Sequence, residues 1–187
     1  MSQQSLLWAP PLSKQQIEII AWELRKQMGL DRRCDIPILH ILEIVTPKII
    51  ENFELHILTV EEFSQEFGKT SHGLYVPEQK HLYLREDVYY GAWDNNGRDR
   101  FTVAHEFAHA ILIELFPQGL HRIASNVKRP TYQDPEWQAN TLASYLLIPP
   151  KLIGNEMNGE NIMNNFSVSF TAAKIAHSNY KKSEQYN

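Results

Sequence analysis

The sequence predicts an α+β fold, with helices packed on a small antiparallel sheet and one chemically distinctive helix at the centre. Two patterns carry that prediction. Apolar residues recur at helical spacing in several segments that are bounded by capping residues or prolines. Residues 53–57 instead alternate between apolar and polar side chains, and the apolar runs 73–76 and 81–84 flank a tight connection at 77–80, as the strands of an antiparallel sheet do.

The expected helices begin at residues whose side chains can cap a helix. Ser13 and Gln16 fit a capping box, Asp134 is a good N-cap followed by Pro135 at the first helical position, and Ser169 can cap the last helix. The expected helices cover residues 13–28, 37–45, 59–67, 135–147 and 170–180, and a further one begins at Arg98 or Arg100 and ends at Leu115.

The length of the chain favours a single domain. It has 187 residues, 43% of them hydrophobic, which is enough for one core and too little to require two. We therefore expect one domain over residues 1–187, with residues 1–12 as an irregular lead-in and residues 182–187 as a frayed tail.

The composition excludes several classes of protein. Eighteen basic residues against twenty-two acidic ones give a net charge of −4. A dedicated nucleic-acid binder would instead carry an excess of positive charge. The longest apolar stretches fall short of the roughly 20 residues of a membrane-spanning helix, and the N-terminus lacks the pattern of a secretory signal. Because Cys34 is the only cysteine, an internal disulfide framework and a thiolate zinc site are excluded. We expect a cytoplasmic protein.

The expected central helix carries the sequence H-E-x-x-H at residues 105–109. Residues at i and i+4 lie on one helix face, so His105 and His109 can reach the same metal ion. Glu106 is offset by one residue and is placed to act on a water molecule as a general base rather than as a ligand. This spacing predicts a catalytic metal site on a rigid element.

A catalytic zinc site takes three protein ligands, and the best candidate for the third is Glu136, in the first turn of the next helix. Asn140 lies at i+4 from Glu136, where its amide can accept a hydrogen bond from the far nitrogen of a ligand histidine. His121 is the competing ligand, but it lies in an irregular stretch and has no evident supporting partner. The predicted ion is Zn²⁺, although manganese or iron can occupy two histidines and a carboxylate.

Four further histidines and the single cysteine are not expected to have a functional role. His40, His56, His72 and His81 show no ligand spacing, and we expect them to be ordinary surface or sheet residues. Cys34 is expected to be inert.

The motifs resemble the ImmA/IrrE metallopeptidase family. Residues 98–109 match R-x-R-F-T-x-A-H-E-x-x-H, residues 136–149 match E-x-x-A-N-x-x-A-x-x-L-L-x-P, and residues 166–169 match F-x-V-S. The resemblance implies a compact zincin-like metallopeptidase domain of the gluzincin kind, similar around its metal to thermolysin. It implies that His105, His109 and Glu136 bind zinc and that Glu106 is the catalytic glutamate.

The sequence departs from the family pattern at a few positions. The family usually has Gly where this chain has Ala108, and a bulky aromatic residue where it has Leu142. It also often has an arginine in the last helix, where this chain offers only Lys174 and Ala176.

The resulting functional hypothesis is a zinc-dependent endopeptidase. Tyr145 or His177 is a candidate second donor to the oxyanion, and the strand at residues 81–85 is a candidate to hold an extended substrate by strand addition. The resemblance implies a substrate that is a helix-turn-helix (XRE-type) repressor or antitoxin, cut to relieve transcriptional repression. The alternative is a non-catalytic, zinc-containing toxin or anti-repressor that acts by binding its partner.

Overall fold

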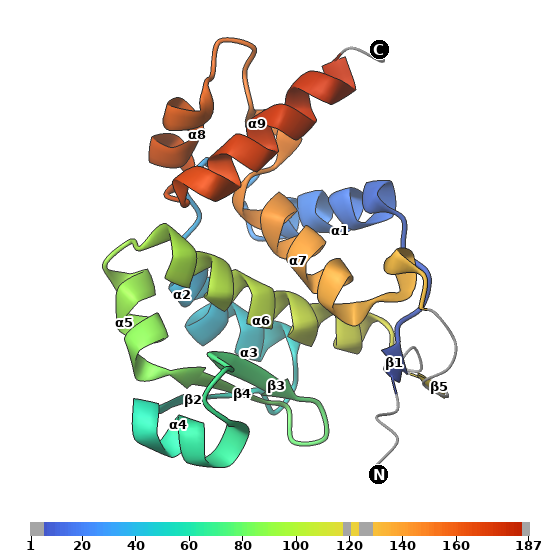
Figure 1. Cartoon of the computed structure of the whole chain (residues 1–187), viewed down its shortest axis with the longest axis vertical. Helices are drawn as coiled ribbons and strands as arrows, with labels where there is room; N and C mark the ends of the chain where they lie inside the picture. The colour runs from blue at the N-terminus through green and yellow to red at the C-terminus, as the bar shows by residue number, and fades with distance from the viewer. Residues whose placement is uncertain (1–5, 118–120, 124–128, 185–187) are drawn as a thin grey trace.

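The computed structural model describes residues 6–117, 121–123 and 129–184 (Figure 1). The strands are β1 (Leu6–Trp8), β2 (Glu54–Leu58), β3 (Gly73–Val76), β4 (His81–Arg85) and β5 (His121–Ile123). The α-helices are α1 (Lys14–Gln27), α2 (Ile38–His40), α3 (Thr46–Ile49), α4 (Val60–Phe67), α5 (Glu86–Trp93), α6 (Gly97–Leu115), α7 (Pro135–Leu147), α8 (Gly159–Phe166) and α9 (Phe170–Glu184). A π-helical segment, η1 (Ile41–Val45), joins α2 to α3, and the short 3₁₀ segments are η2 (Thr131–Gln133) and η3 (Pro150–Leu152).

The predicted α+β class is confirmed, but the main sheet is mixed rather than purely antiparallel. Its strand order is β2-β4-β3, with β3 antiparallel to β4 and β2 parallel to β4. The tight connection at residues 77–80 makes β3 and β4 a hairpin, as predicted. The chain reaches β3 from β2 through α4, so β4 returns beside β2 in the same direction. Local alternation predicts the strands but does not determine this order.

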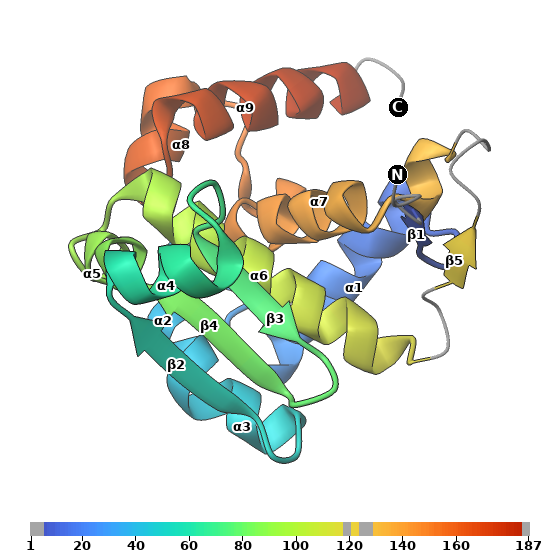
Figure 2. The same cartoon turned by 60° about the horizontal axis from the view of Figure 1, so that its bottom comes forward.

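The two faces of the sheet are covered by different helices. Leu82 and Leu84 of β4 are fully buried on the face that packs against α6. On the other face Tyr83 contacts Phe67 of α4, and Phe67 in turn contacts the fully buried Phe63. Figure 2 shows α4 in front of the sheet and α6 behind it. The sheet is therefore a platform that supports α6 from one side.

Helices α6, α7 and α1 pack side by side, with α7 between the other two (Figure 1). Helices α7 and α1 lie on the side of α6 that faces away from α4. The fully buried residues of α6 and α7 include the alanines Ala104, Ala108, Ala139 and Ala143. Their small side chains allow close approach of helix axes. This approach brings the first turn of α7 next to the middle of α6.

Arg25 fixes the opposite end of α7. Its side chain is fully buried on α1 and donates hydrogen bonds to the carbonyl oxygens of Leu146, Leu30 and Arg33. Burial lowers the pKa of its guanidinium to about 10. These bonds satisfy carbonyls that the end of α7 and the turn after α1 would otherwise leave without partners.

Several elements were not predicted. Helices α5 and α8 were missed, and the second helix continues past Val45 through Pro47 to Ile49. Strand β1 lies in the predicted irregular lead-in and pairs antiparallel with β5. Helix α9 continues to Glu184, and the end of the predicted tail lies outside the described residues. None of the described helices is long and apolar enough to cross a bilayer.

Arg100 anchors the N-terminal part of α6. Its side chain is only 4% exposed, forms an ion pair with Asp35, and donates to the carbonyl oxygens of Ile36 and Ser167 at 2.9 Å each. It therefore joins three segments: the start of α6, the residues before α2, and the turn between α8 and α9. Arg100, the second arginine of the R-x-R motif, is thus a structural clamp, that is, a side chain that holds these three segments together.

Replacing Arg100 with Met is expected to lower the free energy of unfolding by roughly 3 kcal/mol, because it removes a charged donor and leaves buried carbonyls unsatisfied. Chemical denaturation followed by circular dichroism measures the effect. Arg98→Met is the matched control, since Arg98 is exposed, and its effect should stay within about 0.5 kcal/mol. Equal stability of the two variants would contradict the clamp.

Candidate metal centre

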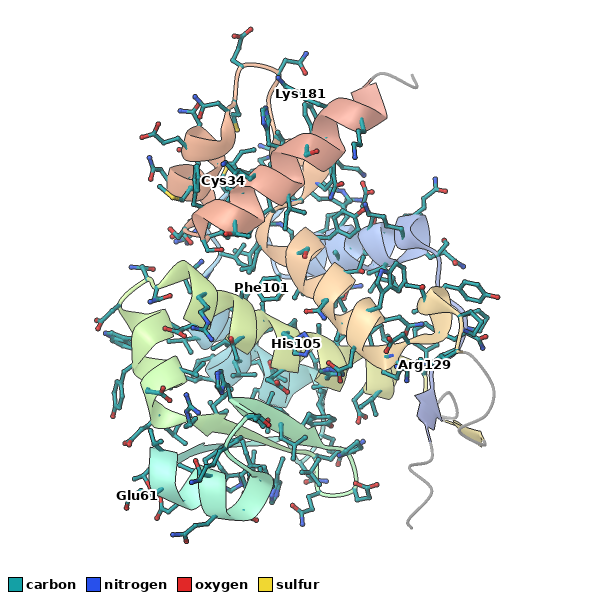
Figure 3. The ribbon with its side chains drawn as sticks, in the orientation of Figure 1. Cys34, Glu61, Phe101, His105, Arg129 and Lys181 are labelled. Atoms are coloured by element: carbon teal, nitrogen blue, oxygen red, sulfur yellow. The ribbon has the colours of Figure 1, made fainter. Side chains whose placement is uncertain are left out.

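Helix α6 presents the H-E-x-x-H residues from a well-anchored element. Asn96 caps the helix by accepting hydrogen bonds from the backbone N–H groups of Arg98 and Asp99. The side chains of His105 and His109 are each 17% exposed, so their imidazoles lie mostly out of solvent. Figure 3 shows His105 on α6 where that helix passes the N-terminal half of α7. The predicted placement on a central, rigid helix is what the structure shows.

The structure brings His105, His109 and Glu136 together. The Nε2 atoms of the two histidines are 3.0 Å apart, and the Glu136 carboxylate oxygens lie 3.3 Å from Nε2 of His105 and 3.4 Å from Nε2 of His109. Donor atoms at about 2.0–2.1 Å from one tetrahedral ion are separated from each other by about 3.3 Å. The donor set therefore fits a divalent ion that is held by two imidazoles and one carboxylate.

Glu136 owes its position to the start of α7. Asp134 is the N-cap and accepts a hydrogen bond from the backbone N–H of Glu136, and Pro135 occupies the first helical position. Hydrogen bonds from His105 and His109 hold the pKa of Glu136 well below its ordinary value. The carboxylate is thus ionised at neutral pH, as a metal ligand must be.

Glu106 faces a different environment from the ligands. It is buried, with 8% exposure, and this burial raises the pKa of its carboxyl above the ordinary value. It does not belong to the group of converging ligand atoms on His105, His109 and Glu136. A buried carboxyl with a raised pKa next to such a group has the properties of a general base.

Gly73 is a neighbour of Glu106 that the sequence analysis did not identify. A Cβ atom added to Gly73 would lie 2.5 Å from Cγ of Glu106 and 2.9 Å from Cδ2 of Leu84. Strand β3 can therefore lie this close to Glu106 only because residue 73 has no side chain. A single glycine forms no pattern in the sequence from which such a role could be predicted.

Asn140 lies one turn after Glu136 on α7, beside His105. Burial alone would lower the pKa of His105, but hydrogen bonding to Glu136, the charges of Glu106 and Glu136, and the Asn140 amide together raise it. Within the described part of the chain, the buried Nδ1 of His105 has no hydrogen-bond partner of normal geometry. Asn140 is the polar side chain placed to supply one.

A cavity of about 510 Å³ opens beside these residues. It lies between α6, β3 and the segment that precedes α1. Its lining includes His72, whose buried Nδ1 has no hydrogen-bond partner among the described residues. The cavity is lined by Ala9, Pro10, Thr70, Ser71, His72, Gly73, Leu74, Tyr75, Pro77, His105, Glu106, His109, Leu112, Ile113, Phe116, Pro135, Glu136 and Gln138.

The two predicted oxyanion donors do not line this cavity. Tyr145 instead lines a separate cavity of about 1000 Å³ against α1, α7 and α9, where burial and then the charge of Glu18 raise its pKa to about 12. His177 lies on α9 and lines neither cavity. The side chain of His121, the competing ligand, lies outside the described residues. His72, which we had expected to be an ordinary residue, is the histidine outside the motif that the structure places here.

Comparison with known families agrees with these motifs. The family model of peptidase M78, described as the IrrE N-terminal-like domain, matches residues 54–178, about two thirds of the chain. The chain belongs to the IrrE N-terminal-like family. The resemblance inferred from the sequence is thereby confirmed, and the match includes α6, α7 and the main sheet. Helix α1 and its Arg25 lie outside the matched residues.

The fold of this IrrE N-terminal-like chain also resembles a solved structure, that of a Mycobacterium tuberculosis transcriptional regulator. The two align with a TM-score of 0.55 and 15% sequence identity over 85% of this chain and 45% of the other. This chain therefore spans less than half of that longer protein, and the likeness concerns the fold. A search of curated proteins gave no significant match.

Proposed function

We propose that this protein is a zinc-dependent endopeptidase. The observation that carries the proposal is the convergence of His105, His109 and Glu136, whose ligand atoms lie within 4.8 Å of one another, next to the buried Glu106. Membership of a peptidase family supports it. A structural zinc site is usually closed by four protein ligands, whereas this group offers three beside an open cavity.

The chain's own residues account for the proton transfers. Zinc held by His105, His109 and Glu136 would supply an acidified water and polarisation of the scissile carbonyl. Glu106 accepts the proton of the attacking water and later donates it to the leaving amine, which its raised pKa favours. His72 is the histidine outside the motif that lines the cavity, so it replaces Tyr145 and His177 as the candidate donor to the oxyanion.

The substrate would bind along β3. Residues 81–85 were expected to bind the substrate by strand addition, and this expectation is wrong because β4 is the central strand and both of its edges are paired. Among the described strands, β3 lies at an edge of the main sheet, and its residues Gly73, Leu74 and Tyr75 line the cavity. An extended peptide that pairs with β3 would run past Glu106, which is the arrangement that peptide hydrolysis requires.

The proposed substrate is a helix-turn-helix repressor or antitoxin, as the family resemblance implies. The test mixes purified protein, Zn²⁺ and the repressor encoded by the neighbouring gene, and measures intact masses. A single cut whose two product masses sum to the substrate plus one water is the expected result. An intact repressor, together with intact members of a diverse peptide pool, would contradict peptidase activity.

Gly73→Ala is expected to lower the rate of peptide hydrolysis by at least about tenfold, because the new methyl group displaces Glu106 from its position and misplaced catalytic groups lose large factors in rate. Zinc content, measured by elemental analysis, should stay unchanged because the atoms nearest to the added Cβ belong to Glu106 and Leu84 and not to the three ligands. Gly154→Ala is the matched control, since a Cβ at Gly154 meets no atom within 4 Å. A fully active Gly73→Ala variant would show that Glu106 tolerates displacement.

A further inference from the structure

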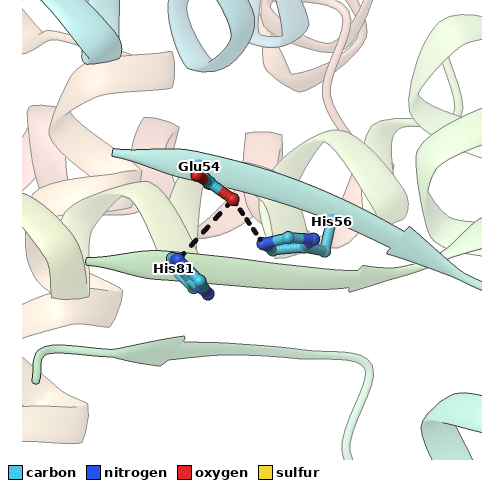
Figure 4. A group of neighbouring side chains, drawn as sticks. All are labelled: Glu54, His56 and His81. Atoms are coloured by element: carbon cyan, nitrogen blue, oxygen red, sulfur yellow. Dashed lines mark ion pairs between the residues drawn. The ribbon is translucent and has the colours of Figure 1, made fainter. Parts of the chain in front are cut away.

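We propose that Glu54, His56 and His81 form a second divalent-metal site, separate from the H-E-x-x-H centre. Glu54 and His56 lie on β2, and His81 lies on the adjacent strand β4 (Figure 4). Both histidines were expected to be ordinary residues because the sequence shows no ligand spacing around them. The structure brings them together on one face of the sheet.

Strand geometry explains the cluster. Glu54 and His56 are at i and i+2 on β2, so their side chains point to the same face. Glu54 is paired with His81 in the parallel ladder, which places the imidazole of His81 on that face as well. Leu55 and Leu82, the next pair, point to the opposite face, where Leu82 is fully buried against the core. The cluster and α6 are therefore on opposite sides of the sheet.

The ligand atoms lie at distances suited to one ion. Oε2 of Glu54 is 3.3 Å from Nε2 of His56 and 3.6 Å from Nε2 of His81, and all three atoms lie within 4.8 Å of one another. Figure 4 shows both imidazoles directed toward the same carboxylate. The glutamate side chain is 61% exposed, so an ion can enter from solvent.

A chain of hydrogen bonds orients His81 for metal binding. The Tyr83 hydroxyl donates its proton to Oε1 of Gln79 at 3.1 Å and lies 3.2 Å from Nδ1 of His81. Because that hydroxyl has only one proton, Nδ1 of His81 must donate to it. Nε2, the other ring nitrogen of His81, is then the one directed toward Glu54. Metal-binding histidines are oriented in this way by a partner at their other ring nitrogen.

His56 provides an independent observation. Its Nε2 atom is buried and, although Oε2 of Glu54 lies 3.3 Å away, no described residue forms a hydrogen bond of normal geometry with it. The ring is held in place by Tyr83 and His81, with centroid distances of 4.9 Å and 4.6 Å. A buried polar atom without a hydrogen bond is costly, and an ion beside Glu54 would satisfy it.

The donor set selects the class of ion. Two imidazoles and one carboxylate suit late first-row divalent ions such as Zn²⁺, Ni²⁺ and Cu²⁺, whereas Ca²⁺ and Mg²⁺ require oxygen ligands. An ion in this position would join β2 to β4 and stabilise their parallel pairing. Strand β4 also pairs with β3, so the same ion would support the strand that contacts Glu106.

The test measures Zn²⁺ bound per chain after dialysis against micromolar free Zn²⁺, using the full chain. Wild type is expected to bind two ions, His56→Asn/His81→Asn one, and His105→Ala/His109→Ala one. Circular dichroism shows whether each variant is folded. If wild type binds a single ion and the His56/His81 variant still binds it, the second site does not exist.

A conservative variant tests the site without removing an aromatic ring. Glu54→Gln in the His105→Ala/His109→Ala background is expected to weaken Zn²⁺ binding by at least about tenfold, because loss of even a supporting partner costs that much. Glu51→Gln is the matched control, since Glu51 is an exposed glutamate just before β2. Equal Zn²⁺ affinity of these two variants would overturn the proposal. Failure of the peptidase proposal would leave this result unaffected, because neither measurement depends on hydrolysis.

Discussion

Replacing Glu106 with Gln is expected to lower peptide hydrolysis by a factor of about 10²–10⁴, the usual contribution of a general base. Gln has nearly the same shape as Glu but cannot accept the proton of the attacking water. Zinc content should be unchanged, because the ligand atoms belong to His105, His109 and Glu136. Single-turnover cleavage of the repressor, with zinc quantified in the same sample, measures both effects.

The stability of this variant provides an internal control. Because burial raises the pKa of Glu106, its ionised form is unfavourable in the folded protein, and a neutral amide should leave the free energy of unfolding unchanged or increase it. Loss of activity therefore cannot be assigned to unfolding. Glu61→Gln on the exposed side of α4 is the matched charge control and should retain full activity.

The same variant distinguishes the endopeptidase from the alternative, a non-catalytic toxin or anti-repressor that only binds its partner. Both hypotheses predict that zinc and the partner remain bound to Glu106→Gln. Only the peptidase hypothesis predicts that an intact repressor persists with the variant but not with wild type. Relief of repression by Glu106→Gln at the wild-type level, without any cleavage, would favour the binding protein.

Glu136→Ala is expected to lower the affinity for zinc at the H-E-x-x-H centre by at least about 100-fold, since it removes a ligand whereas outer-shell changes already cost 10–100-fold. The two imidazoles also lose the carboxylate to which they are paired at 3.3 and 3.4 Å. Hydrolysis should disappear at limiting zinc. Competition titration with a fluorescent zinc chelator measures the affinity.

Removal of zinc should also lower the melting temperature of wild type. An ion present at about 1,000 times its dissociation constant stabilises the fold by about 4 kcal/mol, which for a chain of this size corresponds to a shift on the order of 10 °C. Measured in the His56→Asn/His81→Asn background, so that only the H-E-x-x-H centre responds, Glu136→Ala should show little of the zinc response of that background, while His40→Ala, a change at an exposed histidine, should show all of it. A zinc response that is identical in that background with and without Glu136→Ala would remove Glu136 from the site.

The parts of the fold that were predicted correctly have strong local signals. Asp134 and Pro135 mark the start of α7, and its observed bounds are those expected. Helix α8 has a comparable signal, a capping box between Asn158 and Asn161, which the sequence analysis overlooked. Helix α5 has none, because it follows β4 directly and Arg85 provides no side-chain cap.

The missed features of the site depend on contacts between distant segments. The H-E-x-x-H spacing is a property of one helix, and the first turn of α7 could be found by its own motif. In contrast, Gly73 and His72 reach the cavity only through the pairing of β3 with β4. The position of β4 in the centre of the sheet is likewise a result of long-range pairing. Periodicity in the sequence carries no information about such neighbours.

The edge of β3 that pairs with no described strand imposes a condition on any protein that would be cut here. Pairing with an edge strand uses main-chain N–H and C=O groups, and in a folded helix those groups are already bonded within the helix. A helix-turn-helix protein would therefore be cleaved in a linker, at a frayed terminus or after local unwinding. Selection would then depend as much on the conformational freedom of the target as on its side chains, and DNA that rigidifies the target would protect it.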